Sequence, residues 1–527
     1  MITQYAGIET GLVFTSSQES APVIPSAPIE NSEKKKLQNQ IGVICARSFF
    51  YALQTEPLQK FLEVDDSSIK LMAERVGQFV EAFFQNIESA GKSDRLEFVE
   101  DGRPPILFVL ERPRENKPVH LFIATLAELL GKGTYKIVYR ARKISLHPDN
   151  QDAIEKCIKQ IDSTPALRNE ILTHLGNDLY VYSKAKSSND NGTILFGIKM
   201  HSLMMQISEI AASPHCPPLP EPLLPPLYPD KVPKEVEFFQ ARFNTTLGKA
   251  SRYRSVPLTD LKDSLTVSFR TIDMINACIA VVRFLGLLHV HSFAHRDIKE
   301  NNIGIFYSEL SQRFGVIVFD FDLVRQPRIR FDTPRFHDRW DGSTIYGSVL
   351  PSSDVYSLAV MFASLVFKDF KKSKVPEECN IMDVTTQAIK ETVQGVCLYL
   401  KVPVLEADFS ICSSTDILEK IIQHIQSNKF SADQTALTQE HINFIKKVWL
   451  VKAAALELLE KAVLGGGKLF KFLQENKTTK VPLLSLKMKV SSYQRSSAID
   501  RLNEEFGLSL ADVLRRLEVT KKGICES

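Results

Sequence analysis

The chain has 527 residues, of which 44% are hydrophobic and 24% are charged, which is enough material for a sizeable core and for about two to four domains. Its 65 lysines and arginines nearly balance 62 acidic residues, so the charge gives no indication of nucleic acid as the main partner. The eight cysteines are scattered, without C-x-x-C pairs or metal-ligand spacing, which predicts free thiols in a reducing compartment.

Targeting signals are not visible in the sequence. The N-terminus has no basic-then-apolar signal peptide. The most apolar segment, Met274 to His291, is interrupted by Arg283 and is short for a bilayer span. We therefore expect a cytoplasmic protein with no membrane span.

The N-terminal region divides into two parts. Residues 1–38 are poor in large apolar residues and rich in Ser, Pro and charge, which predicts a disordered tail. Residues 39–98 predict a helical extension, and residues 68–87 carry apolar residues at helical spacing, namely Leu71, Val76, Phe79, Val80 and Phe83.

A β-rich region follows. Short apolar runs near residues 96–101, 105–112 and 119–130 predict strands, and "LLGKGTYKIVYRARK" predicts two strands around a glycine turn. Residues 165–176 predict a helix, and residues 178–185 and 193–202 predict two further strands. The prolines of residues 213–233 predict an extended surface insertion, which is either a docking site for a proline-reading module or a spacer.

Beyond residue 233 the chain is predicted to be mostly helical to its end. Polar residues then concentrate in "AHRDIKENNIGIF", where His295 to Asn302 precede an apolar strand. A second apolar strand, "GVIVFDFDLV", ends at Asp320 and is followed by Asp322.

These residues are the set that transfer of a nucleotide's γ-phosphoryl group requires. Gly131 and Gly133 allow backbone N–H groups to approach phosphates, and the oxygens of Asn302 and Asp320 suit Mg²⁺. A carboxylate can take the proton of the attacking hydroxyl, and a lysine can offset the charge that develops on the transferred group.

The motifs together resemble those of eukaryotic-type Ser/Thr protein kinases. "HRDIKENN" resembles the catalytic loop, "LGKGTYKIV" the glycine-rich loop, "FDFDLV" the magnesium-binding D-F-G, "FDTPRF" the G-T-P-x-Y stretch, and "SSDVYSLAVMFASL" the helix beneath the catalytic loop. They occur in the correct order over roughly residues 100–470.

The resemblance implies an α+β, bilobal fold with a β-rich N-lobe and a helical C-lobe. The kinase-like domain would cover residues 99–475, between the helical extension and a helical C-terminal tail at 476–527. It implies ATP and Mg²⁺ as cofactors and a protein as substrate.

The resemblance also implies roles for individual residues. Asp297 would be the catalytic base, Lys299 would touch the γ-phosphate, and Asn302 and Asp320 would hold Mg²⁺. Gly131, Gly133 and Val138 would contact the nucleotide. Arg296 would be able to clamp a phosphorylated activation segment, and Asp354 would cap the backbone of the catalytic loop.

The sequence departs from the family at three places. Lys136 stands where the third glycine of the loop is expected, and Asp322 replaces the glycine of D-F-G, which places two carboxylates near the metal site. No A-P-E motif follows, so control by phosphorylation of this segment is doubtful.

The lysine that should contact the α- and β-phosphates has two candidate positions. In one alignment it is Lys199, on the strand "FGIKM", with Glu235 on a following helix as its partner. In the other, which we favour slightly, it is Lys156, and its partner is Glu170 on the helix at residues 165–176.

Three functions fit these observations. The leading one is an active, Mg-dependent protein Ser/Thr kinase. The substitutions at Lys136 and Asp322 favour the second, a pseudokinase or scaffold module that binds nucleotide without turnover. The third is a small-molecule phosphotransferase of kinase-like fold. The divergent core and unfamiliar flanks resemble bacterial eukaryotic-type kinases, some of which act inside host cells.

Overall fold

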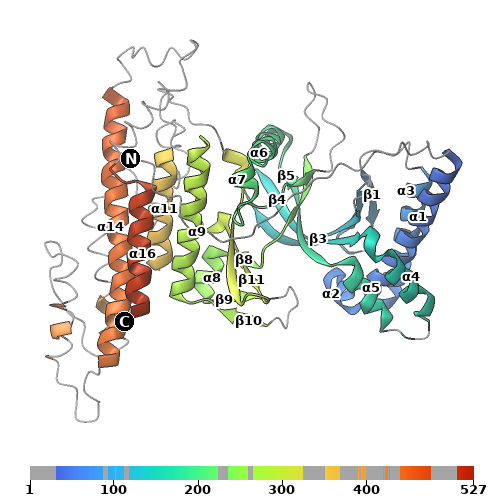
Figure 1. Ribbon diagram of the computed structural model, residues 1–527, viewed down its shortest axis with the longest axis horizontal. Helices are drawn as coiled ribbons and strands as arrows, with labels where there is room; N and C mark the ends of the chain where they lie inside the picture. The colour runs from blue at the N-terminus through green and yellow to red at the C-terminus, as the bar shows by residue number, and fades with distance from the viewer. Residues whose placement is uncertain are drawn as a thin grey trace, which may run out of the picture.

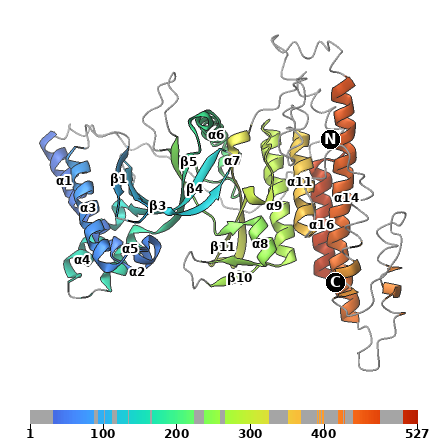
Figure 2. The ribbon, with the colours of Figure 1, turned by 180° about the vertical axis from the view of Figure 1, so that it is seen from behind.

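The computed structural model describes residues 31–86, 93–100, 102–111, 118–133, 135–162, 164, 166–222, 236–258, 265–324, 351–367, 439–475 and 507–526, with short helical pieces between 390 and 427. Among these residues the protein is mixed α+β (Figures 1 and 2), as the sequence predicts. An antiparallel sheet lies between a group of N-terminal helices and a group of C-terminal helices.

The main sheet has seven strands in the order β1-β2-β3-β4-β5-β7-β6, and all neighbouring pairs are antiparallel. Its strands are β1 (Ser93–Phe98), β2 (Ile106–Glu111), β3 (Val119–Lys132), β4 (Lys136–Leu146), β5 (Asp178–Ala185), β6 (Glu221–Pro222) and β7 (Glu237–Ala241). The glycine turn joins β3 to β4, as expected.

Five helices cover one face of this sheet. They are α1 (Asn31–Leu53), α2 (Glu56–Leu62), α3 (Asp66–Gln85), α4 (Gln151–Gln160) and α5 (Leu167–Leu175). Their apolar residues form one core with residues of β2, β3 and β4. The predicted tail is therefore helical from Asn31 onward, and the predicted helical extension ends in strand β1. Residues 1–30 lie outside the described part.

Helix α3 shows how local sequence sets this packing. Asp65 caps its N-terminus by accepting a hydrogen bond from the Ser68 N–H at 2.8 Å. Val76, Val80 and Phe83 are buried, as predicted, but Leu71 lies off this face and is 47% exposed.

The C-terminal half is built on α9 (Thr271–Val290), α11 (Pro351–Val366), α14 (Gln439–Glu475) and α16 (Leu510–Glu526). They share one core with the short sheet β12-β11-β8. Smaller elements complete the half: α7 (Ser208–Ala211), β8 (Thr245–Thr246), α8 (Leu247–Tyr253), β9 (Ser255–Pro257), β10 (Thr266–Ser268), β11 (Ile303–Ser308) and β12 (Arg313–Val318).

Helix α16 lies against α9 and α14, and its Val513 and Leu517 are buried in their core. The predicted C-terminal tail thus contributes to the helical half. Helix α9 alone among the described helices is long and apolar enough to cross a membrane, and 61% of that window is buried inside the protein.

Two predicted elements have the wrong type. Residues 193–202, predicted as a strand, belong to helix α6 (Asn191–Met204), and residues 234–243, predicted as a helix, contain strand β7. The start of the proline-rich insertion packs on the protein, because the Val318 N–H donates to the His215 carbonyl at 2.9 Å. Residues 223–235, which include Glu235, lie outside the described part.

Candidate functional site

The predicted catalytic loop connects α9 to β11. Helix α9 buries Ile275, Ile279 and Val282 in the C-terminal core and so fixes where the chain enters the loop. The loop ends in a short 3₁₀ turn, η3 (Glu300–Asn302), before β11 begins. It therefore runs between two elements that the core holds in place.

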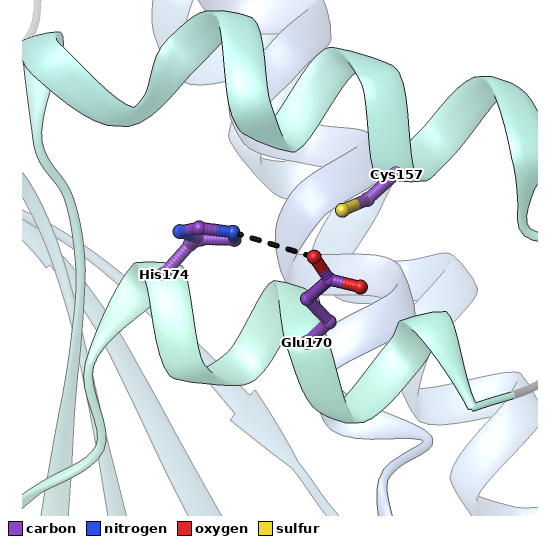
Figure 3. Close-up of side chains that lie close together, drawn as sticks. All are labelled: Cys157, Glu170 and His174. Atoms are coloured by element: carbon purple, nitrogen blue, oxygen red, sulfur yellow. Dashed lines mark ion pairs between the residues drawn. The ribbon is translucent and has the colours of Figure 1, made fainter.

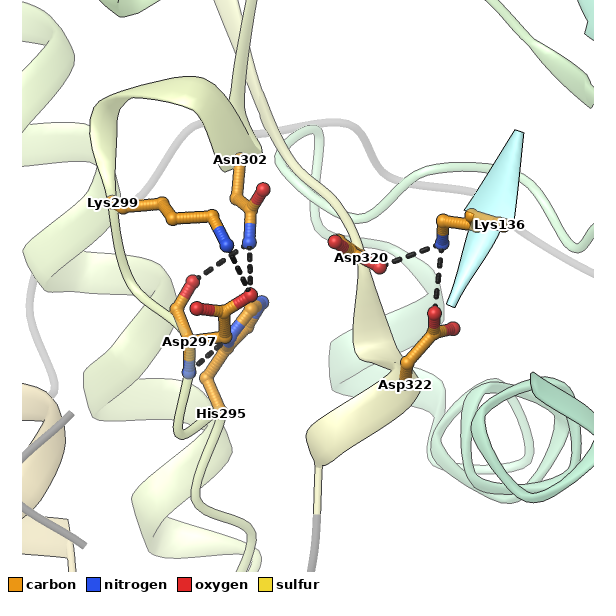
Figure 4. Close-up of polar contacts among 7 residues, drawn as sticks. All are labelled: Lys136, His295, Asp297, Lys299, Asn302, Asp320 and Asp322. Atoms are coloured by element: carbon orange, nitrogen blue, oxygen red, sulfur yellow. Dashed lines mark hydrogen bonds and ion pairs between the residues drawn. The ribbon is translucent and has the colours of Figure 1, made fainter. Parts of the chain in front are cut away.

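Within the loop, the polar side chains converge on Asp297 (Figure 4). The Lys299 ammonium donates to Asp297 Oδ2 at 2.7 Å, and the Asn302 amide donates to the same oxygen at 2.8 Å. The amide also donates to the Asp297 carbonyl at 2.9 Å. Both side-chain donors thus bind Oδ2, and Asp297 Oδ1 accepts no side-chain hydrogen bond among the described residues.

Asp354, at the start of α11, anchors the loop from below, as its resemblance predicts. Its fully buried carboxylate accepts the backbone N–H groups of His295 at 2.8 Å and Arg296 at 2.7 Å, and the His289 ring at 2.9 Å. Burial would raise the pKa of Asp354, but these hydrogen bonds and the charge of His289 hold it below its usual value. His289 was not singled out from the sequence.

Strand β12 brings Asp320 to the same place. Val318 pairs with Ile303, and the Phe319 N–H donates to the Asn302 carbonyl at 3.0 Å. Asp320 follows directly, with a left-handed backbone (φ 71°), and Arg296 in the loop has φ 69°. Such conformations in non-glycine residues concentrate at functional sites. Asn302 and Asp320 are thus neighbours, which is the arrangement that a shared metal site requires.

The donor set at this point fits Mg²⁺. Because the Asn302 amide nitrogen is held by Asp297, the Oδ1 oxygen turns toward Asp320, as Figure 4 shows. A carboxylate and an amide oxygen are hard ligands of the kind that Mg²⁺ prefers. Asn302 and Asp320 are the residues that would hold the ion.

Lys136 was noted in the sequence only as a departure from the glycine-rich loop and was not expected among the site residues. It begins β4, and its ammonium donates to Asp320 Oδ1 at 2.6 Å and to Asp322 Oδ2 at 3.0 Å (Figure 4). Burial alone would lower the pKa of Lys136, but the two carboxylates outweigh it and raise the pKa above the usual lysine value. The sequence signal was a lysine at the position of the third glycine.

The two carboxylates differ in their surroundings. Burial would raise the pKa of Asp320, but Lys136 holds it below its usual value. Burial raises the pKa of Asp322, and the charge of Asp320 adds to the rise while Lys136 opposes it. Asp320 therefore stays ionised more readily, which suits a metal ligand.

Helix α6 packs directly against the segment that carries these acids. A Cβ at Gly197 would lie 2.7 Å from the Cα of Asp322, so only glycine permits this approach. The rings of His201 and Phe321 meet edge to face with centroids 4.7 Å apart, and His295 contacts Phe321 at 5.4 Å. Phe321 thus joins α6 to the catalytic loop.

The glycine hairpin has the expected form. The Gly133 N–H donates to the Lys136 carbonyl at 2.9 Å, and Gly131 pairs with Val138 across β3 and β4. A Cβ at Gly131 would meet no atom within 4 Å, so the hairpin has open space beside it. The hairpin already uses the Gly133 N–H, so contact of Gly131 and Gly133 with phosphates stays a prediction.

The two lysines proposed from the sequence do not reach the site. Lys199 is exposed on helix α6, which removes the strand that the first alignment needed. Lys156 is exposed on α4, among the N-terminal helices. Alignment to the kinase motifs proposed both lysines, Lys199 on a predicted strand and Lys156 in the less regular region between Lys143 and Lys159, and both side chains are exposed on helices instead.

Glu170 lies on α5, in the group of N-terminal helices, and Figure 3 shows it beside His174 and Cys157. Its carboxylate is 3.8 Å from His174 Nε2, and its ligand atom, that of His174 and the buried Cys157 thiol all lie within 4.8 Å of one another. Burial, followed by the nearby Glu170 carboxylate, raises the pKa of the Cys157 thiol. The cluster joins α4 to α5, so Glu170 is not the partner of a phosphate-binding lysine.

The remaining motif, "FDTPRF", lies outside the described residues. No protein-family model matches the chain, and no curated protein matches it. The assignment of function therefore depends on the geometry and chemistry of the residues described above.

Proposed function

We propose that this protein is an ATP- and Mg²⁺-dependent protein Ser/Thr kinase with a bilobal, kinase-like fold. The observation that carries the proposal is the hydrogen bond between the Phe319 N–H and the Asn302 carbonyl. It brings Asp320 beside a loop in which Lys299 and Asn302 already hold Asp297. Base, lysine and metal ligands then share one location.

Each residue of the loop has a defined task in this proposal. Asp297 accepts the proton of the protein hydroxyl through its Oδ1 oxygen, since Oδ2 is held by Lys299 and Asn302. Lys299 lies close enough to offset negative charge on the group being transferred. Bound Mg²⁺ would neutralise charge on the β- and γ-phosphate oxygens.

The test compares wild-type protein with Asp297→Asn, using labelled ATP, Mg²⁺ and a generic protein acceptor. We expect transfer to fall by at least about 100-fold, because the variant loses the base while keeping its size. Asp149→Asn is the matched control, since that acid is exposed in a 3₁₀ turn beside α4. Equal transfer by wild type and Asp297→Asn would exclude the proposal.

A second candidate is a module that binds nucleotide without turnover. Asp322 in place of glycine favours it, because Lys136 pairs with both Asp320 and Asp322 and so competes for a metal ligand. Thermal stabilisation by ATP with and without Mg²⁺, measured beside autophosphorylation, separates the candidates. Binding without transfer would favour the module.

A further inference from the structure

The strand order of the main sheet indicates where a phosphate-binding lysine would lie in a kinase-like fold. In protein kinases this lysine is on the third strand counted from the glycine-rich hairpin, and a glutamate of the next helix pairs with it. Here β3 and β4 flank the glycine turn, so the third strand is β5 and the next helix is α6. Helix α6 contains no acidic residue, so that ion pair cannot form.

The lysine of β5 points to the wrong face. Lys184 pairs with Ile137 across β4 and β5, and its ammonium lies 5.7 Å above the ring of Tyr139. Side chains alternate along a strand, so Lys184 shares its face with Tyr182, which is buried against Phe239. Lys184 is therefore directed away from the Asp320 side.

The opposite face of β5 carries a methyl group where a lysine would be needed. Ala185 packs near Ile194 and Ile198 of α6, and its register partner on β4 is Lys136. Register partners on neighbouring strands point to the same side of a sheet. Lys136 on β4 therefore places its ammonium on the same face of the sheet as Ala185 of β5, which itself carries no charge.

We propose that Lys136 is the lysine that contacts the phosphates of the nucleotide. Its ammonium already lies 2.6 Å from Asp320, and a magnesium ion held by Asp320 would bring phosphate oxygens within a few ångströms of the same carboxylate. This inference rests on the proposed function, since it names a further residue of the same site.

The test uses full-length protein with Lys136→Met and Lys136→Arg, and with Lys184→Met as the matched control on β5. Binding is measured by ATP displacement of a fluorescent trinitrophenyl-ATP in the presence of Mg²⁺, and transfer by labelled ATP. Lys136→Arg keeps a positive charge between Asp320 and Asp322. It can therefore still test the inference if Lys136→Met does not fold. Thermal unfolding confirms that each variant is folded.

We expect kcat/KM to fall by at least about 100-fold in Lys136→Met and by at least about tenfold in Lys136→Arg, with less than about a threefold change in Lys184→Met. Weaker ATP binding by Lys136→Met than by Lys184→Met supports the inference even without turnover. A loss confined to Lys184→Met would overturn it. Failure of the proposed function is recognised separately, as equal transfer by wild type and Asp297→Asn.

Discussion

The catalytic loop and the glycine hairpin bring charged groups to one place by different routes. In the loop, the contacts of Lys299 and Asn302 with Asp297 span two and five residues of the chain. The contact of Lys136 with Asp320 spans 184 residues. Contacts of the first kind lie within a short motif, whereas the second depends on strand register. A sequence can therefore predict the first kind of contact more readily than the second.

The largest expected effect tests whether the conformation of the catalytic loop depends on Asp354, which lies far from it in the sequence. In Asp354→Ala two backbone N–H groups and His289 lose their buried acceptor, which should cost about 3–5 kcal/mol of unfolding free energy. Denaturant unfolding measures this cost. The unfolding free energy of Asp354→Asn should lie between those of Asp354→Ala and wild type. An unchanged midpoint in Asp354→Ala would mean that the loop needs no distant anchor.

The next effect concerns α6 and pH. Burial lowers the pKa of His201 to about 4, so the folded protein keeps this ring neutral while an unfolded chain protonates it near its ordinary value. Stability is therefore complete above about pH 6.5 and is lost as pH falls toward 4. We expect a loss of about 2 kcal/mol between pH 7 and 5.

Chemical unfolding at both pH values, with His201→Asn as the control, measures this contribution. The variant should lose correspondingly less stability than wild type over the same interval. Identical pH dependence in the two proteins would show that His201 is not held neutral in α6.

A smaller effect tests the close contact between α6 and Asp322. Gly197→Ala places a methyl group 2.7 Å from the Asp322 Cα, and the overlap should cost about 1–2 kcal/mol despite the better helix propensity of alanine. Gly192→Ala on the same helix, where a Cβ meets no atom within 4 Å, should not destabilise. Equal stability of the two variants would contradict the close approach.

Moving the lysine from β4 to its register partner on β5 tests whether the shared face of the sheet is sufficient. The double variant Lys136→Gly with Ala185→Lys should transfer phosphate about tenfold faster than Lys136→Gly alone, because the two positions are register partners. This gain corresponds to about 1.4 kcal/mol. Single-turnover transfer measures the recovery. A double variant as inactive as Lys136→Gly would mean that the shared face does not suffice.

The smallest effects are expected at the residues proposed from sequence alone. Lys156→Met, Lys199→Met and Glu170→Gln should each change phosphate transfer by less than about twofold, because none of these side chains lies at the catalytic loop. Steady-state assays with labelled ATP measure this. A tenfold loss in any one of them would restore the corresponding alignment.

Most strands and helices could be predicted because their residues alternate or repeat with the period of the element. Helix α6 could not, because Ile194, Phe196 and Ile198 alternate as in a strand. Its true buried positions include Gly197, which carries no side chain and so hides the helical repeat. Strand β7 was missed because the acidic and aromatic residues of 234–243 fit a helical pattern.

The roles of Asp297, Lys299 and Asn302 were predicted from the resemblance of "HRDIKENN" to a kinase catalytic loop, and their contacts with one another lie within this motif. The role proposed for Lys136 was not predicted, although its position in the glycine hairpin was noted. Recognising that role requires knowing that Ala185 lies opposite and that Lys184 faces away, and register between strands is set by packing of whole faces. Asp297 is thus an example of a residue whose role a motif predicts, and Lys136 is an example of one whose proposed role needs the strand register.

The sheet half and the helical half have separate apolar cores, yet the charged groups of the site are divided between them. Lys136 belongs to the sheet, whereas Asp297, Asn302 and Asp320 belong to the helical half. Helix α6 contributes to both sides, with Ile194 near the sheet and Met204 in the helical core. A movement of β4 relative to the end of β12 would therefore change the separation of Lys136 and Asp320 while both interiors keep their packing.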